Sequence, residues 1–114
     1  MDASQMRDKL RNLLDAQRLG VLATNKDGQP HSRLVAVAGT VDLKCLLFCT
    51  SRTTSKYENI RIDPRVSLLM DNRSNMKSDF TDALAVTALG MASEPQRADR
   101  DELVNIYIQC STSA

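Results

Sequence analysis

The densest group of side chains suited to binding an anion lies at residues 50–56, in the stretch Thr-Ser-Arg-Thr-Thr-Ser-Lys, with five hydroxyls and two cations. It leads into a segment with helical spacing, and the backbone N–H groups at a helix N-terminus attract anions. Hydroxyls and cations add charge-assisted hydrogen bonds, so a terminal phosphate fits this arrangement. The alternative is a plain turn in which Ser55 and Glu58 cap the helix, which is the commoner use of these residue types.

A second candidate is Arg33, which stands among apolar residues in an expected strand. A cation in such a strand is seldom buried without an anion, so Arg33 either meets an anionic ligand or lies on the exposed face of an edge strand. The sole histidine, His31, follows an expected turn and has no second histidine or suitably spaced acid beside it. We therefore predict no metal site.

Other reactive residue types fail to form a recognisable catalytic set. Cys45 and Cys49 lie four residues apart in an expected strand, so they share a face and are predicted to be small apolar core groups. Three acids, Asp71, Asp79 and Asp82, frame a polar loop without pairing as general acid and base. The catalytic residues are unknown from the sequence alone.

Periodicity and turn residues predict the elements that must position these candidates. Apolar spacing predicts helices at residues 3–18, 55–62 and 102–109, the first capped by Asp2 or Ser4. Strands are expected at residues 21–24, 31–38, 43–50, 65–70 and 83–92, with Gly90 marking a bulge. The Asp27-Gly28 pair between the first two strands is a strong hairpin signal. Five short strands with few long connections favour an antiparallel barrel or meander whose open edges a partner subunit would cover.

Composition restricts the classes of function. The chain has 114 residues, 42% hydrophobic and 25% charged, which predicts one domain over residues 1–114. A net charge of +1 and an aromatic content of 4% disfavour nucleic-acid binding. No apolar run approaches the roughly 20 residues that span a bilayer, and no signal peptide is recognisable. Three cysteines are unsuited to a disulfide framework, so a reducing, cytoplasmic location is expected.

The ordered string of short motifs resembles the pyridoxamine 5′-phosphate oxidase-like proteins, which have the FMN-binding split-barrel fold. The motifs are Leu-Ala-Thr at 22–24, Asp-Gly-Gln-Pro-His at 27–31, Leu-Phe-Cys-Thr at 47–50, Ser-Lys-Tyr-Glu-Asn-Ile at 55–60 and Asp-Pro-Arg-Val-Ser-Leu-Leu at 63–69. The resemblance extends from about residue 19 to about residue 94. It implies a mainly β, α+β fold: an antiparallel split β-barrel with flanking helices, which forms a homodimer with FMN at the interface.

The resemblance also implies which residues contact FMN. Arg33 would reach the phosphate, while the segment Leu34, Val35 and Ala36 would run beside the flavin ring. The residues implied near the ribityl chain and phosphate are Thr50, Ser51, Thr54, Ser55, Lys56 and Asn59. Ser55 stands where the family has the arginine of a Ser-Arg-Lys phosphate clamp. With the resemblance, a phosphate site at residues 50–56 becomes the favoured interpretation.

Three departures from the oxidase itself separate this chain from that enzyme. Ala38 stands where the oxidase has a lysine, and Ala85 stands where it has a glutamine. The C-terminal region that carries the oxidase's substrate-binding aromatic and arginine has no counterpart, and we expect the C-terminal end to be shortened relative to small family members. We therefore expect a protein other than the oxidase.

The resulting prediction is a cytoplasmic, homodimeric, FMN-binding flavoprotein that acts as a flavin-dependent oxidoreductase on a small molecule or electron donor of unknown identity. Two alternatives stay open. The first is a haem-binding or haem-utilisation protein of the same fold, and the second is a flavin-binding module without chemistry. Neither nucleic acid nor a membrane is expected as a partner.

Overall fold

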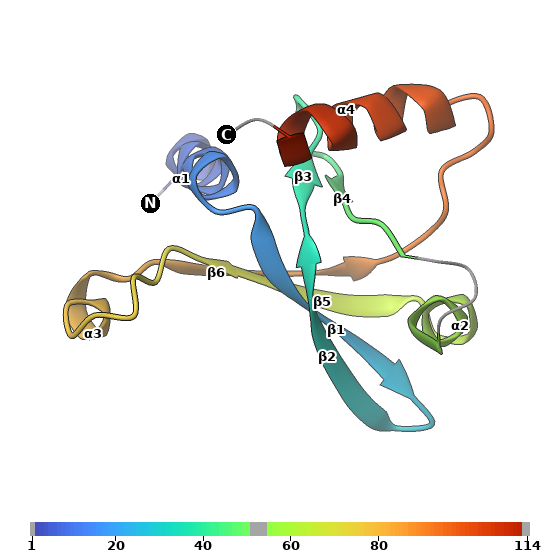
Figure 1. Cartoon of the computed structure of the whole chain (residues 1–114), viewed down its shortest axis with the longest axis horizontal. Helices are drawn as coiled ribbons and strands as arrows, with labels where there is room; N and C mark the ends of the chain where they lie inside the picture. The colour runs from blue at the N-terminus through green and yellow to red at the C-terminus, as the bar shows by residue number, and fades with distance from the viewer. Residues whose placement is uncertain (1, 51–54, 113–114) are drawn as a thin grey trace.

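The computed structural model of the chain describes residues 2–50 and 55–112. Two sheets and four helices make up the fold (Figure 1). The helices are α1 (Ala3–Ala16), α2 (Ser55–Ile62), α3 (Asp79–Asp82) and α4 (Arg100–Thr112). The strands are β1 (Leu19–Lys26), β2 (Gln29–Ala36), β3 (Ala38–Gly39), β4 (Leu46–Leu47), β5 (Arg65–Asp71) and β6 (Ala85–Met91).

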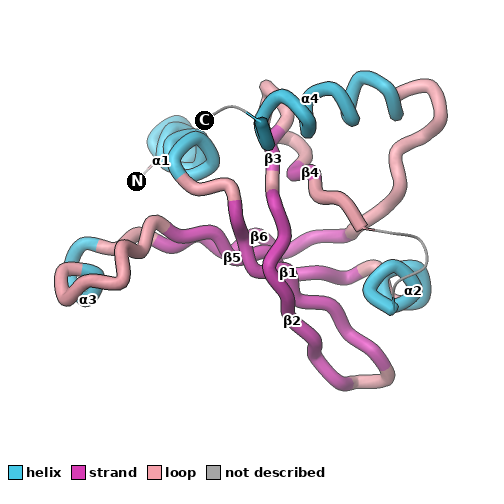
Figure 2. Tube along the Cα trace, in the orientation of Figure 1, coloured by secondary structure: helices cyan, strands magenta, loops and turns pink. Residues whose placement is uncertain are grey.

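The larger sheet has the strand order β2-β1-β5-β6, with every neighbouring pair antiparallel, and β3 and β4 form a small second sheet (Figure 2). This confirms the predicted α+β architecture of an antiparallel sheet with flanking helices. The predicted hairpin is confirmed as well: Asp27 and Gly28 both have positive φ, 51° and 84°, as a tight type I′ turn requires. Lys26 and Gln29 are the first cross-strand pair beyond it.

One face of the larger sheet, here called the inner face, carries the hydrophobic core. Leu22 of β1 is 1% exposed and Met70 of β5 is 2% exposed, and both belong to a cluster with Leu14 of α1 and Val37. Ile60 of α2 packs against the same cluster. The inner face is thus covered by α1, by the segment around β3 and β4, and by α2, which fixes the position of α2 relative to the sheet.

The opposite face of the sheet, here called the outer face, carries apolar side chains without a cover among the described residues. The pairing register places Val21, Leu34 and Leu69 side by side on it, because directly opposed residues point to the same side of an antiparallel sheet. Leu34 is 64% exposed and Leu89 of β6 is 82% exposed. A water-facing side of an antiparallel sheet is normally polar, so this face is unusual for a free monomer.

The predicted strand at residues 43–50 is wrong for most of its length. The third expected strand is reduced to the two residues of β4, Leu46 and Leu47, which pair with Gly39 and Ala38. The reason is the tight turn after β3, in which Leu43 has a φ of 57° and the Thr40 side chain bonds to Asp42. The prediction that Cys45 and Cys49 are core groups is therefore also wrong, since both are exposed.

Several element boundaries also differ from the sequence-based expectation. The first helix ends at Ala16 rather than residue 18, and it begins at the predicted Asp2 cap, whose carboxylate accepts the Gln5 N–H at 2.8 Å. The loop expected at residues 71–82 contains α3. Gly90 forms no bulge, because it pairs with Val66 in an uninterrupted register. The last helix is longer than predicted and runs to Thr112.

The end of α2 is tied to the sheet by the carboxylate of Asp63. It accepts hydrogen bonds from Arg65 Nε at 2.9 Å, from Arg65 Nη2 at 2.8 Å and from Asn25 Nδ2 of β1 at 3.2 Å. The Arg65 side chain first, and Asn25 second, hold the pKa of Asp63 well below its ordinary value. Pro64 directly follows and prevents the helix from continuing.

We predict that Asp63→Asn lowers the melting temperature at pH 7, and that the loss shrinks as the pH falls below about 4. A carboxyl whose pKa is depressed on folding stabilises the folded state above its unfolded pKa, near 3.8, and loses that contribution as the pH falls through the folded value. Thermal unfolding of both proteins at pH 7 and pH 3 tests this.

The matched control is Asp8→Asn, which removes the same charge from the exposed side of α1 and should leave the melting temperature nearly unchanged at both pH values. A melting temperature of Asp63→Asn equal to that of the wild type at pH 7 would contradict the role given to Asp63.

Candidate functional site

The helix α2 begins directly after the hydroxyl-rich segment, at Ser55, as the sequence predicts. It packs against β1, and its Asn59 is only 7% exposed, on the side that faces the sheet. Arg61 and Glu58 form an exposed ion pair one turn apart. The first backbone N–H groups of α2 have no acceptor within the helix itself, and such groups at a helix N-terminus are the feature that a phosphate site needs.

Arg33 lies on β2, which is an edge strand because it pairs with β1 alone. Its direct cross-strand partner is Leu22, so Arg33 points to the inner face, the same face on which α2 packs. The guanidinium is exposed and forms no hydrogen bond or ion pair with the described residues. A cation aimed at the inner face without an acidic partner is suited to meet an anion bound beside α2.

The residues that follow Arg33 alternate between the two faces of the sheet. Val35 is 7% exposed and belongs to the core, whereas Leu34 lies on the outer face with 64% of its surface exposed. Ala36 is half-buried and pairs with Leu19. On the side away from β1, β2 pairs with no other strand in the described part of the chain. Its peptide groups on that side can therefore form hydrogen bonds to a planar ring that bears donors and acceptors.

The remaining predicted contacts are only partly described. Thr50 is half-buried at the end of the segment that follows β4. Ser51 and Thr54 lie outside the described residues. Ser55 and Lys56 are the first two residues of α2, so their backbone lies at the helix N-terminus. The five hydroxyls and two cations at residues 50–56 therefore precede or begin the helix.

A phosphorylated ring compound such as FMN fits these features. The inner face brings an exposed cation on β2 and the N-terminus of α2 to one side of the sheet, and the open edge of β2 borders the same region. FMN needs hydrogen-bond donors for its dianionic phosphate and hydrogen-bonding groups for the polar edge of its flat ring. Arg33 and the N-terminus of α2 offer the first, and the peptide groups at the open edge of β2 offer the second.

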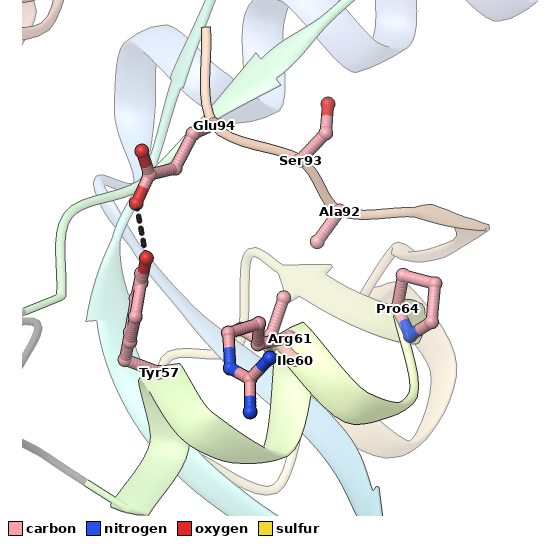
Figure 3. Close-up of a pocket in the computed structure, with 7 residues that line it drawn as sticks. All are labelled: Tyr57, Ile60, Arg61, Pro64, Ala92, Ser93 and Glu94. Atoms are coloured by element: carbon pink, nitrogen blue, oxygen red, sulfur yellow. Dashed lines mark hydrogen bonds between the residues drawn. The ribbon is translucent and has the colours of Figure 1, made fainter.

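A cavity lies between α2 and the segment at residues 92–94 (Figure 3). It has a volume of about 310 Å³ and is lined by Tyr57, Ile60, Arg61, Pro64, Ala92, Ser93 and Glu94. One end is closed by a hydrogen bond from the Tyr57 hydroxyl to Glu94 Oε1, at 2.5 Å. Sequence reasoning missed this cavity: the spacing of Tyr57 and Arg61 places them on one face of the predicted helix, but nothing in the sequence brings residues 92–94 against it.

Comparison with known proteins gives the family. The family model described as pyridoxamine 5′-phosphate oxidase matches residues 6–109, which is most of the chain. The chain belongs to the pyridoxamine 5′-phosphate oxidase family. The resemblance noted in the sequence is thereby confirmed, together with the fold class of this family. No curated protein matches the chain.

Solved structures of similar fold bind different groups according to their descriptions. A haem-binding protein from Mycobacterium smegmatis superposes with a TM-score of 0.74 and 22% identity, over 88% of this chain and 40% of that one. A FAD-binding protein from Mesorhizobium loti superposes with a TM-score of 0.71 and 24% identity, over 97% of this chain and 74% of that one. A FAD-binding protein from M. smegmatis superposes with a TM-score of 0.68 and 20% identity, over 92% of this chain and 78% of that one. The chain thus spans less than half the length of the haem-binding protein.

The two alanines that replace polar residues of the oxidase, Ala38 and Ala85, lie in very different surroundings. Ala38 is 2% exposed in β3, opposite Leu47, so its position is filled by the core. Ala85 begins β6 and is exposed, opposite Asp71. Neither position offers a polar side chain to a ligand.

The described residues offer little else that is reactive. They contain no group of three or more histidine, cysteine, aspartate or glutamate side chains placed to hold a metal ion. His31 is exposed on β2 and points to the inner face, opposite Thr24. Among the helices that the structure describes, none is long and apolar enough to cross a membrane.

Proposed function

We propose that this protein binds a flavin nucleotide, FMN in the first instance, and acts as a flavin-dependent oxidoreductase. The observation that carries the proposal is the register of β2 and β1, which directs Arg33 to the face where α2 begins with Ser55 and Lys56. In this arrangement Arg33, Lys56 and the helix N-terminus hold the phosphate, with Thr50, Ser51 and Thr54 adding hydroxyl bonds.

The ring system lies along β2, where the peptide groups of Leu34 and Val35 orient it and Ala36 leaves room beside it. A bound flavin supplies hydride and electron transfer, while the protein supplies binding, orientation and the electrostatic surroundings. Asn59 contributes a buried amide under α2. The proposed partner in the reaction is a small-molecule substrate or electron donor, and the free thiols of Cys45 and Cys49 support a reducing, cytoplasmic setting.

We predict that Arg33→Ala and Lys56→Ala each weaken FMN binding by roughly 10- to 150-fold, the effect of one charge-assisted hydrogen bond. Riboflavin lacks the phosphate, so its weaker affinity should change little in either variant. Thr54→Ala should have a smaller effect on FMN, because a neutral hydroxyl bond contributes less. Titration calorimetry with both ligands measures these affinities.

The control is Arg7→Ala, which removes an exposed arginine from α1 and should leave both affinities as they are. If FMN affinity survives both charge substitutions, the segment at residues 50–56 is a capped turn and the phosphate site is disproved. Equal losses for FMN and riboflavin would instead indicate a general weakening of the fold.

Haem is the second candidate ligand, favoured by the description of the M. smegmatis haem-binding protein and by the exposed His31 on the inner face. Haem binding usually needs an axial ligand such as histidine. A Soret band on adding haem that is lost in His31→Ala would favour this candidate over the flavin. A flavin that binds but is not reduced by any nicotinamide donor would favour a binding module without chemistry.

The proposal includes a homodimer in which the outer faces of two copies meet. Four large apolar residues on that face are more than half exposed: Leu19, Leu34, Leu89 and Met91. They come from three of the four strands of the sheet, so they form a broad surface rather than a single exposed side chain. Two copies joined across it would bury these residues and bring the ring site on β2 close to the partner subunit.

We predict that the wild type sediments as a dimer at micromolar concentration and that Leu89→Glu sediments as a single 12.6 kDa chain. A stable dimer should bury more than roughly 1,200 Å², and a charge buried within that interface cannot be solvated there. Val41→Glu is the matched control, since Val41 is 91% exposed on the turn after β3, away from the outer face. A monomeric wild type, with and without FMN, would overturn the dimer.

We also predict that the protein does not oxidise pyridoxamine 5′-phosphate at an ordinary enzyme rate, on the order of 1 per second. Ala38 and Ala85 replace the oxidase's lysine and glutamine, and the core fills the first of these positions. Incubation of the FMN-loaded protein with pyridoxamine 5′-phosphate and oxygen tests this by the absorbance of the product. Product formation at that rate would disprove the prediction.

A further inference from the structure

We propose that the open edge of β6 pairs with the same strand of a second copy, which joins the larger sheets of two copies into one continuous sheet. In the described part of the chain, β6 pairs with β5 alone, so one of its two edges meets no strand. Unpaired peptide groups along a sheet edge are a template for another strand. This contact differs from the proposed outer-face dimer, because it uses backbone groups of the edge rather than side chains of the face.

The hydrogen bonds at the two ends of the β5–β6 ladder show which peptide groups of β6 face the open edge. At one end the Ala92 N–H donates to the Pro64 carbonyl oxygen at 2.8 Å. At the other end the Asn72 N–H donates to the Leu84 carbonyl oxygen at 3.1 Å. Along an antiparallel strand, residues that bond the partner alternate with residues whose peptide groups point away from it, so the even-numbered residues of β6 bond β5. The residues whose peptide groups point to the open edge are Ala85, Thr87, Leu89 and Met91.

The β6 edge lacks the features that usually keep a strand edge from pairing. Natural sheets block their edges with charged side chains, proline or bulges. The seven residues of β6 include no charged residue and no proline, and their register with β5 is uninterrupted. Gly90 is exposed, and apart from its chain neighbours no atom lies within 4 Å of the place where its Cβ would stand. Another strand can therefore approach this edge closely.

The opposite edge of the sheet, on β2, is protected. The Val37 N–H donates to the Arg18 carbonyl oxygen at 2.7 Å, so the alternation directs the peptide groups of Val35 and Arg33 toward β1. The even-numbered residues of β2 then face the open side, and one of them is Pro30, which has no N–H to donate. With only one edge available in each copy, pairing ends at two sheets and does not continue into a fibre.

A second copy of β6 offers a matching set of peptide groups. Two antiparallel β6 strands centred on Ala88 align over their whole length, with Thr87 of one copy opposite Leu89 of the other. Residues opposed in this way both point their peptide groups across the gap, so each such pair exchanges two N–H···O=C bonds. A two-fold axis at Ala88 makes every contact occur twice, as in a closed dimer.

The side chains are self-complementary in the same register. Directly opposed side chains of an antiparallel pair stand about 4.5–5.5 Å apart, so a large side chain packs well against a small one. Each larger side chain of β6 meets a smaller one of the second copy, and no charges meet. The opposed pairs are Leu89 with Thr87, Met91 with Ala85 and Val86 with Gly90.

The edge contact is small, because a single strand from each copy takes part. It falls short of the roughly 1,200 Å² of a stable interface, so we expect it to form at high protein concentration. It requires neither flavin binding nor the outer-face dimer, since it doubles the mass of whichever species is present. Loss of the flavin site would therefore leave this proposal standing.

The test removes one donor from the open edge and leaves the β5–β6 ladder intact. In Thr87→Pro the lost N–H is one that faces away from β5, a position at which an edge strand accepts proline. We expect the wild type at about 500 μM to have twice the mass of Thr87→Pro in sedimentation equilibrium. The matched control is Ser32→Pro, which removes an outward N–H from the edge of β2 and should keep the wild-type mass.

Amide hydrogen exchange of the wild type gives a second readout that needs no substitution. At about 500 μM the Thr87 and Leu89 N–H groups should be protected by roughly tenfold or more, because pairing bonds them, while the Ser32 N–H stays unprotected. Unprotected edge amides overturn the proposal, whether or not Thr87→Pro folds. A folded Thr87→Pro with the same mass as the wild type overturns it as well, because any association then uses another surface.

Discussion

Leu22 is 1% exposed at the middle of β1, and the cluster around it determines where most other parts of the molecule lie. This cluster lies on the inner face of the sheet, where α1, the segment around β3 and β4, and α2 cover it. A single helix, α1, cannot shield a four-stranded sheet, so α2 and the small second sheet are needed to keep water from Leu22 and Met70. The same covering that stabilises the fold thus brings the start of α2 to the face that Arg33 shares.

The outer face shows the consequence of having only one covered side. Its apolar residues, Leu34 and Leu89 among them, are not buried by the cluster, because the sheet itself separates them from it. A chain of this size buries a limited fraction of its surface, so leaving a broad apolar face to water is costly unless another molecule covers it. In the proposed dimer, cofactor and partner would meet at the same strand, since Leu34 of the outer face and Arg33 of the inner face are neighbours on β2.

Sequence patterns predicted the parts of the fold that local physics specifies. The hairpin at Asp27 and Gly28 follows from the positive φ that its turn requires, and the end of α2 follows from Pro64. Cys45 and Cys49 were mispredicted because a turn after β3, and not the apolar run, decided the pairing. The outer face and the cavity behind α2 were not predictable, because both depend on which distant strands pair.

The proposed cofactor site depends both on local sequence patterns and on which distant strands pair. This explains how a family can keep a fold while its members are described as binding different groups. A phosphate at a helix N-terminus and a ring beside a strand edge use peptide groups that every sequence possesses, so the proposed site would tolerate changes such as Ser55 in place of arginine. Chemistry and ligand size depend instead on side chains that point into the remaining space. At Ala38 and Ala85 this chain has only a methyl group, so neither position supplies a polar contact to a ligand. In the proposed flavin site, the choice of ligand must therefore depend on side chains at other positions.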